Sequence, residues 1–169
     1  MSVPVSEHPQ QLSSRLVIII HAEAYMGRLT QKGQVQAGLA AEQLVRLPGD
    51  WQLLSARDVW EQLTTNVIRQ AAAAVGWELE YRVLVCLGQH KAGTAIMKGL
   101  KERLSPNIGT FVVMSARSVE KLLAESFSYC LSRHYATPGS IWEVNWPTGE
   151  CWQVWAGSEV APGQEGVHV

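Results

Sequence analysis

The stretch RLVIIIHAEAYMGRLTQKG, from Arg15 to Gly33, contains the most informative change of character in the chain. Its apolar run, residues 16–20, ends abruptly at His21, which small and acidic residues follow. A short apolar run rich in β-branched residues is typical of a strand that is buried on both faces. The pattern therefore predicts a buried strand over residues 15–20, with His21 at its carboxyl end.

The rest of the chain alternates between helical and strand-like patterns. Helices are predicted over residues 30–47, from Asp58 to about Gly76, over residues 94–104, and from Ser118 onward. Strands are predicted over residues 51–55, 81–88 and 110–114. The segment IWEVNWPTGECWQVW, residues 141–155, alternates apolar and polar residues around Pro-Thr-Gly-Glu, which indicates a hairpin.

Two of the predicted helices have more detailed signals. The first has an apolar stripe along one face, formed by Val35, Leu39, Leu44 and Leu47. The second begins with Asp58 as an N-cap and has Glu61 three residues later, the spacing of a capping box. The first helix is therefore expected to be amphipathic, and the second to begin at Asp58.

Strands that alternate with helices indicate an α/β domain. We predict a three-layer α/β/α sandwich with a mainly parallel central sheet and an antiparallel C-terminal edge hairpin. The domain is expected over residues 15–156, with a polar arm at 1–14 and a polar tail at 157–169. Ligands of such sheets bind outside the carboxyl ends of the strands, so three predicted strand ends, at His21, before Arg57 and at Ser115, are expected to converge.

Composition narrows the classes of function. The formal net charge of −1 gives no electrostatic basis for nucleic-acid binding. The chain contains no apolar run of the length that spans a membrane and no secretory leader pattern, so a cytoplasmic location is expected. Its 3 cysteines are widely spaced and predict neither a disulfide framework nor a metal site. No cofactor is expected either.

The spacing of these features resembles the histidine phosphatase (phosphoglycerate mutase-like) superfamily, and within it the small phosphohistidine phosphatases that have no lid. The resemblance covers residues 15–155. In that family the first strand ends in Arg-His-Gly, and His21 stands at the histidine. The family opens its first helix with Leu-Thr-x-x-Gly-x-x-Gln-Ala, which is matched by Leu29, Thr30, Gly33, Gln36 and Ala37.

The resemblance implies a histidine that attacks a phosphoryl group and is surrounded by two arginines and a second histidine, which hold the negative charge. Three of these groups are replaced. Ile20 stands at the first arginine, Val59 at the second and Ser115 at the second histidine. Ala22 also replaces the glycine after His21.

The three replacements remove a large interaction free energy. Each charge-assisted contact is worth about 1.5–3 kcal/mol, so the loss of three removes about 4–9 kcal/mol. At ~1.4 kcal/mol per factor of ten, this corresponds to a thousandfold to a millionfold in binding or rate. The resemblance therefore predicts the fold together with a severely weakened reaction.

Displaced arginines offer one way to rebuild an anion pocket. Arg57 and Arg117 each lie two residues from a missing group, and Arg28 lies in the loop after His21. Amide groups at the start of the helix near Arg117 could assist them. The other interpretation, which we favour, is that these are ordinary solvated loop charges.

Other polar residues near the predicted rim also have two interpretations. Glu23 is either a surface carboxylate or a group that orients His21 or binds a cation. His90 follows a predicted strand, in the loop that can carry the proton donor of the family, but Gln89 and His90 supply no carboxylate. His8 and His134 have no ligand partner at metal spacing.

Two functions remain open from the sequence. The first is a catalytically inactive protein of the histidine-phosphatase fold that acts as a protein-interaction or regulatory domain, with a protein as its partner. The second is a slow or altered phosphatase that uses His21 as the nucleophile, with phosphate or another small anion as ligand. Tryptophans of the predicted hairpin either pack on the core or form a binding patch, namely Trp142, Trp146, Trp152 and Trp155.

Overall fold

The computed structural model describes residues 14–88, 90–126, 137–146 and 151–155. The strands are β1 (Ser14–Ile20), β2 (Ala24–Tyr25), β3 (Arg28–Leu29), β4 (Trp51–Ser55), β5 (Glu80–Val83), β6 (Gly109–Met114), β7 (Ile141–Trp146) and β8 (Cys151–Trp155). The helices are α1 (Gln31–Val45), α2 (Val59–Ala74), the 3-10 helix η1 (Val85–Leu87), α3 (Gly93–Lys101) and α4 (Ala116–Ser126). The expected arm and tail lie outside these residues, except that β1 begins one residue early, at Ser14.

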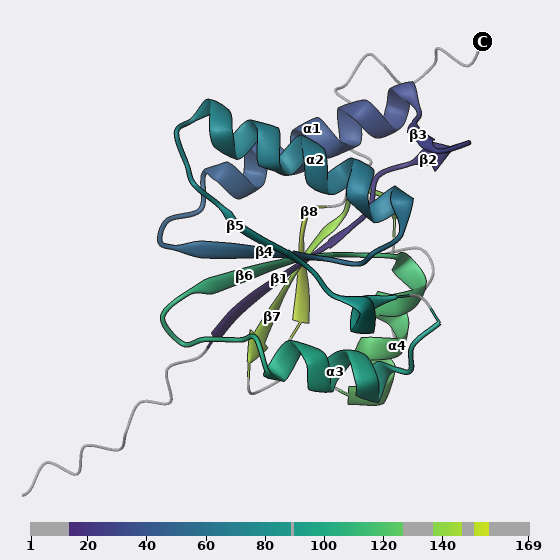
Figure 1. Cartoon of the computed structure of the whole chain (residues 1–169), viewed down its shortest axis with the longest axis vertical. Coiled ribbons are helices and arrows are strands. Elements are labelled where there is room, and N and C mark those ends of the chain that lie inside the picture. Colours follow the sequence, from purple (N-terminus) through teal and green to yellow (C-terminus); the bar gives the residue numbers. More distant parts are fainter. Residues whose placement is uncertain (1–13, 89, 127–136, 147–150, 156–169) are drawn as a thin grey trace, which may run out of the picture.

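A six-stranded sheet forms the central layer, in the order β5-β4-β6-β1-β7-β8. The first four strands in this order are parallel, whereas β7 runs antiparallel to both β1 and β8. Helices α1 and α2 lie on one side of the sheet and α3 and α4 on the other (Figure 1). The predicted three-layer fold, with a mainly parallel sheet and an antiparallel hairpin at its edge, is confirmed.

The alternation of side chains along β1 shows why its sequence is apolar throughout. Leu16, Ile18 and Ile20 belong to the core beneath α3 and α4. Val17 and Ile19 belong to the core beneath α1 and α2. Every one of these side chains is at most 2% exposed, so β1 is buried on both faces as predicted.

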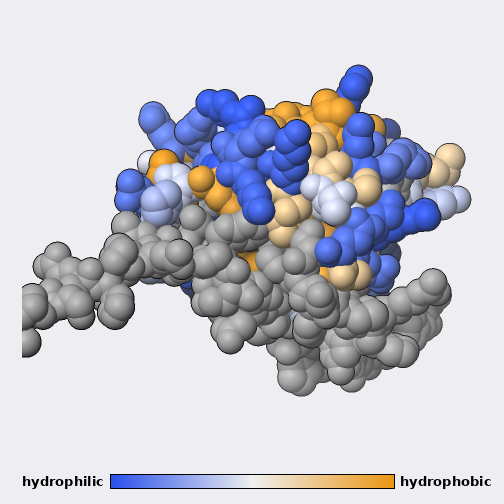
Figure 2. All heavy atoms as spheres, turned by 90° about the horizontal axis from the view of Figure 1, so that it is seen from below, coloured by the Kyte–Doolittle hydropathy of each residue, from blue (hydrophilic) through white to orange (hydrophobic). Residues whose placement is uncertain are grey.

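The two sides of the molecule are covered differently. Helices α3 and α4 contribute large aliphatic residues to their core, namely Ile96, Leu100, Val119, Leu122 and Leu123. Hydrophilic and hydrophobic residues both appear on the outer surface of this side, and the hydrophobic ones gather toward one edge (Figure 2). Helix α1 instead buries small residues, so it lies close to α2, with which it makes extensive contact.

Three predictions about individual elements are wrong. The strand expected over 81–88 is the short edge strand β5 followed by η1, because the chain leaves the sheet after Leu84 donates to the Ser55 carbonyl oxygen at 2.9 Å. Val35 is 54% exposed, since α1 turns its alanine-rich face inward. The capping box at the start of α2 is absent, because the Asp58 side chain makes no capping hydrogen bond.

The C-terminal hairpin packs one tryptophan firmly. Trp142 is 2% exposed, and its indole Nε1 donates to Ser140 Oγ at 3.1 Å. Trp155 is half-buried, and the side chains of Trp146 and Trp152 lie outside the described residues. Trp142 is therefore a core residue. Among the helices that the structure describes, none is long and apolar enough to cross a membrane.

Candidate functional site

The carboxyl ends of three parallel strands form the rim that the sequence predicted. Strand β6 lies between β4 and β1, and the three run in register. The backbone N–H of His21 donates to the Met114 carbonyl oxygen at 3.1 Å, and that of Ala56 donates to the Val113 carbonyl oxygen at 3.1 Å. The residues after β1, β4 and β6 are therefore held side by side.

His21 is half-buried at this rim and has a defined ring orientation. Its Nδ1 lies 3.0 Å from the Ala22 carbonyl oxygen. Because a carbonyl oxygen only accepts hydrogen bonds, the neutral ring carries its proton on Nδ1 and leaves the Nε2 lone pair free. The ring also contacts Trp60, with centroids 5.7 Å apart and planes tilted by 59°.

The loop after His21 is fixed by side chains of both helices above it. The Ala22 N–H donates to Thr64 Oγ1 of α2 at 2.9 Å, and the Glu23 N–H donates to Gln36 Oε1 of α1 at 2.9 Å. Ala22, Thr64 and Gln36 are all buried. The backbone beside His21 is thus held by buried hydrogen bonds, which stabilise one conformation of the loop.

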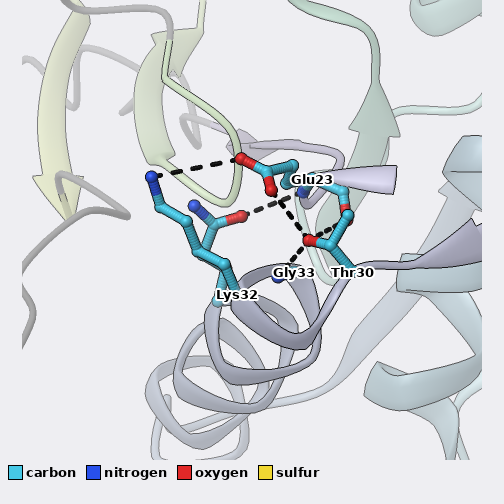
Figure 3. Close-up of polar contacts among 5 residues, drawn as sticks. Glu23, Thr30, Lys32 and Gly33 are labelled. Atoms are coloured by element: carbon cyan, nitrogen blue, oxygen red, sulfur yellow. Dashed lines mark hydrogen bonds and ion pairs between the residues drawn. The ribbon is translucent and has the colours of Figure 1, made fainter. Parts of the chain in front are cut away.

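Glu23 is bound to the start of α1 (Figure 3). Its Oε1 accepts from the Thr30 hydroxyl at 2.8 Å, and its Oε2 lies 4.0 Å from Lys32 Nζ. Thr30 in turn accepts from the Gly33 N–H at 2.9 Å, as an N-cap residue does. No hydrogen bond or ion pair joins Glu23 to His21 among the described residues, so a role in orienting His21 stays a prediction.

The same region explains the Leu-Thr-x-x-Gly-x-x-Gln pattern physically. Thr30 caps the helix, and Gln36 accepts from the loop. Gly33 lies so close to the loop that an added Cβ would stand 1.8 Å from the Glu23 carbonyl oxygen. Each of the three residues is therefore required by the close approach of the β1 loop to α1.

Ser115 has a structural contact of its own. Its Oγ accepts from the Ser118 N–H at 3.1 Å and donates to Ser118 Oγ at 3.0 Å. Its carbonyl oxygen accepts from the Val119 N–H at 3.1 Å. Ser115 therefore caps α4, at the position that the sequence resemblance assigns to the second histidine of the family.

The three candidate arginines, Arg28, Arg57 and Arg117, are all exposed. None of their guanidinium groups makes a hydrogen bond, ion pair or ring contact with another residue in the described part of the chain. Val59, at the position of the second family arginine, is 58% exposed. A rebuilt anion pocket thus stays a prediction, with no contact between these arginines and His21 to support it.

Glu61 is a site residue that the sequence interpretation missed. It is 2% exposed, and its Oε2 has no hydrogen-bond partner among the described residues. Burial raises the pKa of Glu61, the nearby Asp58 adds to the rise, and its own backbone N–H and the charge of His21 oppose it. A buried carboxyl group therefore lies within electrostatic reach of His21.

His90 is the other histidine in the part of the chain that the structure describes. His90 is exposed in the loop between η1 and α3. Gln89, His8 and His134 lie outside the described residues. A catalytic role of His90 stays a prediction. Within the described ranges, no group of three or more histidine, cysteine or acidic residues could hold a metal ion.

A surface cavity lies away from His21. Its volume is about 640 Å³, and it lies at the C-terminal end of α2. Its lining residues are Asn66, Arg69, Gln70, Ala73, Gly76, Trp77, Glu78 and Leu79. Because His21 adjoins the opposite end of α2, through Trp60, this cavity is separate from the site.

Comparison with known proteins gives a consistent result at the level of the fold. No protein-family model and no curated protein sequence matches the chain. Among solved structures, the protein histidine phosphatase SixA in complex with tungstate matches with a TM-score of 0.65 at 17% identity, over 83% of this chain and 94% of that one.

Two other solved structures have related activities. A mycobacterial glucosyl-3-phosphoglycerate phosphatase matches with a TM-score of 0.57 at 13% identity, over 85% of this chain and 98% of that one. A phosphoglycerate mutase from Plasmodium falciparum matches with a TM-score of 0.58 at 10% identity, over 88% and 94%. The rim of β1, β4 and β6, with His21 at the end of β1, is thus built on the fold of the histidine phosphatases.

Proposed function

We propose that this protein is a catalytically inactive member of the histidine-phosphatase fold that serves as a protein-interaction or regulatory domain. The observation that carries the proposal is the environment of His21. The ring contacts the Trp60 indole, and the Glu61 carboxyl interacts with it electrostatically. An aromatic ring and a carboxyl group do not stabilise the two negative charges of a transferring phosphoryl group.

The positions that would hold the phosphoryl group have acquired other roles. Ser115 caps α4 through its hydroxyl, and Val59 is an exposed aliphatic residue at the start of α2. Glu61 interacts electrostatically with His21. When it is ionised, it would also repel an anion bound beside His21. The fold supports His21 at the rim, but the two side chains that interact with its ring do not stabilise the negative charge of the family reaction.

A second function is favoured by one specific contact. The hydrogen bond from His21 Nδ1 to the Ala22 carbonyl oxygen leaves Nε2 unprotonated, as a nucleophile requires. A slow phosphatase would use this Nε2 and draw the arginines of the rim loops toward the substrate. This candidate differs from the first by a single measurable property, a rate that depends on His21.

The test is hydrolysis of an aryl phosphate and of a phosphohistidine peptide by the full chain. We expect equal rates for wild type and His21→Ala, with His8→Ala, in the polar arm expected from the sequence, as the matched control. Tungstate is expected to leave the thermal unfolding midpoint unchanged. Hydrolysis by the wild type and His8→Ala that His21→Ala abolishes would overturn the inactive assignment and establish the phosphatase.

A further inference from the structure

Four exposed apolar side chains lie on the hairpin that follows His21 and on the first turn of α2, whose Trp60 contacts the His21 ring. The short hairpin of β2 and β3 lies next to the N-terminal ends of α1 and α2 (Figure 1), and β3 contacts both helices. The hairpin exposes Tyr25 by 71% and Met26 by 82%, and the first turn of α2 exposes Val59 by 58% and Trp60 by 48%. We call these four residues the rim patch.

Met26 has no structural reason for its place. It has a φ of +49°, in the left-handed region, and Gly27 after it has a φ of +75°. Two positive φ values in a two-residue hairpin loop favour Asn-Gly or Gly-Gly, because other side chains cost about 1 kcal/mol or more there. Neither backbone preference nor burial explains a methionine at this tip. An external contact would explain it, since methionine adapts to varied apolar surfaces.

Charges beside the rim patch indicate the chemistry of its partner. Arg28 follows the hairpin tip and Arg57 precedes α2; both are exposed, and no described residue forms an ion pair with either. Asp58 offsets one of these charges, and the Lys32–Glu23 pair is neutral as a whole. Glu61 is buried, so the exposed flanking groups carry a net positive charge around an apolar centre.

We propose that the rim patch binds an acidic segment of a partner protein that carries at least one large apolar side chain. The inference rests on the proposed interaction function and names the surface and the partner chemistry. Tyr25, Met26 and Trp60 supply the aromatic and sulfur-containing contacts that dominate protein interfaces. Arg28 and Arg57 attract the acidic residues and orient the segment, and this attraction weakens as salt rises.

The first experiment selects ligands from a random peptide library displayed on phage, with the full chain immobilised. We expect the selected peptides to be rich in Asp and Glu and to contain Trp, Phe or Leu. One selected peptide is then synthesised with a fluorescent label, and its dissociation constant is measured by polarisation. Raising the salt from 0.05 to 0.3 M should weaken the binding several-fold.

Variants then place the peptide on the rim patch. Trp60→Ala should weaken binding at least tenfold. Val59→Ala should weaken it more than Val75→Ala, which truncates an exposed valine at the other end of the same helix. Arg57→Glu should weaken it more than Arg46→Glu, which reverses an exposed charge at the end of α1.

Met26→Asn separates binding from folding. Asparagine suits the left-handed backbone better than methionine, so this variant should keep or raise the thermal unfolding midpoint while it weakens peptide binding. A purely structural role of Met26 would give the opposite result for stability and no change in binding.

The proposal is overturned if no peptide is selected, if the selected peptides lack acidic residues, or if the rim variants bind as wild type does. It is also overturned if anionic phosphatidylserine vesicles bind with the same dependence on Trp60 and Arg57 while peptides do not. These outcomes are independent of the hydrolysis assay with His21→Ala. A failure of the rim patch can therefore be told apart from a failure of the inactive assignment.

Discussion

The imidazole Nδ1 of His21 lies 3.0 Å from the carbonyl oxygen of Ala22. Because that oxygen cannot donate, we expect the neutral ring to carry its proton on Nδ1. Long-range ¹H–¹⁵N NMR spectra recorded above pH 8 should show this tautomer, with the signals assigned by their loss in His21→Asn. A proton found on Nε2 would contradict the geometry.

Thr64 should be essential for the loop that holds His21. Its Oγ1 accepts the buried Ala22 N–H at 2.9 Å, and Thr64→Val would leave that donor without a partner. We expect a loss of about 1–3 kcal/mol in the free energy of unfolding. Urea titrations measure it, with Thr94→Val at an exposed position of α3 as the control within about 0.5 kcal/mol of wild type.

Two glycines of α1 should respond in opposite directions to alanine. At Gly33 a Cβ would stand 1.8 Å from the Glu23 carbonyl oxygen, whereas at Gly38 nothing lies within 4 Å. Gly33→Ala should therefore destabilise the protein by about 1–3 kcal/mol or more. Gly38→Ala should stabilise it by about 0.5–1 kcal/mol, because alanine favours a helix interior. Denaturant unfolding of the two variants under identical conditions gives the comparison, and a stable Gly33→Ala would refute the close contact.

Glu61 should lower stability as pH rises. Burial raises its folded-state pKa above the usual value of 4.5, so the folded protein holds the proton more tightly than the unfolded chain does. Below pH 4.5 both states are protonated and no penalty exists. As pH rises beyond 4.5, the unfolded chain ionises first and the wild type loses stability until the folded carboxyl ionises as well.

The neutral variant Glu61→Gln removes that titration. Its stability relative to wild type should increase as pH rises from 4 to 8, measured by urea unfolding at each pH. Glu42→Gln, at an exposed position of α1, serves as the control and should stay within about 0.5 kcal/mol of wild type. A stability difference between Glu61→Gln and wild type that does not change with pH would show that Glu61 is not desolvated.

Introducing an arginine at position 59 should increase the affinity of the protein for tungstate. Val59→Arg places a guanidinium at the position of the second family arginine, and Val59 is exposed, so the change is tolerated. We expect tungstate to bind this variant about tenfold more tightly than wild type. Val75→Arg, at the far end of α2, is the matched control, and an equal gain there would disprove the site-specific effect.

Local patterns predicted the parts of the fold that depend on local interactions. The apolar run of β1 and the strand over residues 51–55 were confirmed, because continuous burial leaves a direct mark on composition. The start of α1 was located by Thr30 and Gly33, each of which makes a contact within a few residues or with the neighbouring loop.

The errors arose where tertiary packing outweighs local pattern. Val35 is apolar but exposed, because the small residues of α1 allow a closer approach of α2 than Val35 would. Glu61 has the spacing of a capping residue, yet it lies buried near His21, a residue 40 positions earlier in the chain. The hairpin of Tyr25 and Arg28 has strands too short to produce any periodic signal.

The position of β1 in the sheet has a consequence for synthesis of the chain. Both of its neighbours, β6 and β7, come from the C-terminal half, and Arg15 meets Glu143 across 128 residues. While the ribosome is still translating the first hundred residues, the most apolar strand of the protein has no partner on either edge. We expect the nascent chain to remain unfolded around β1 until β6 emerges, and to need protection from aggregation during that interval.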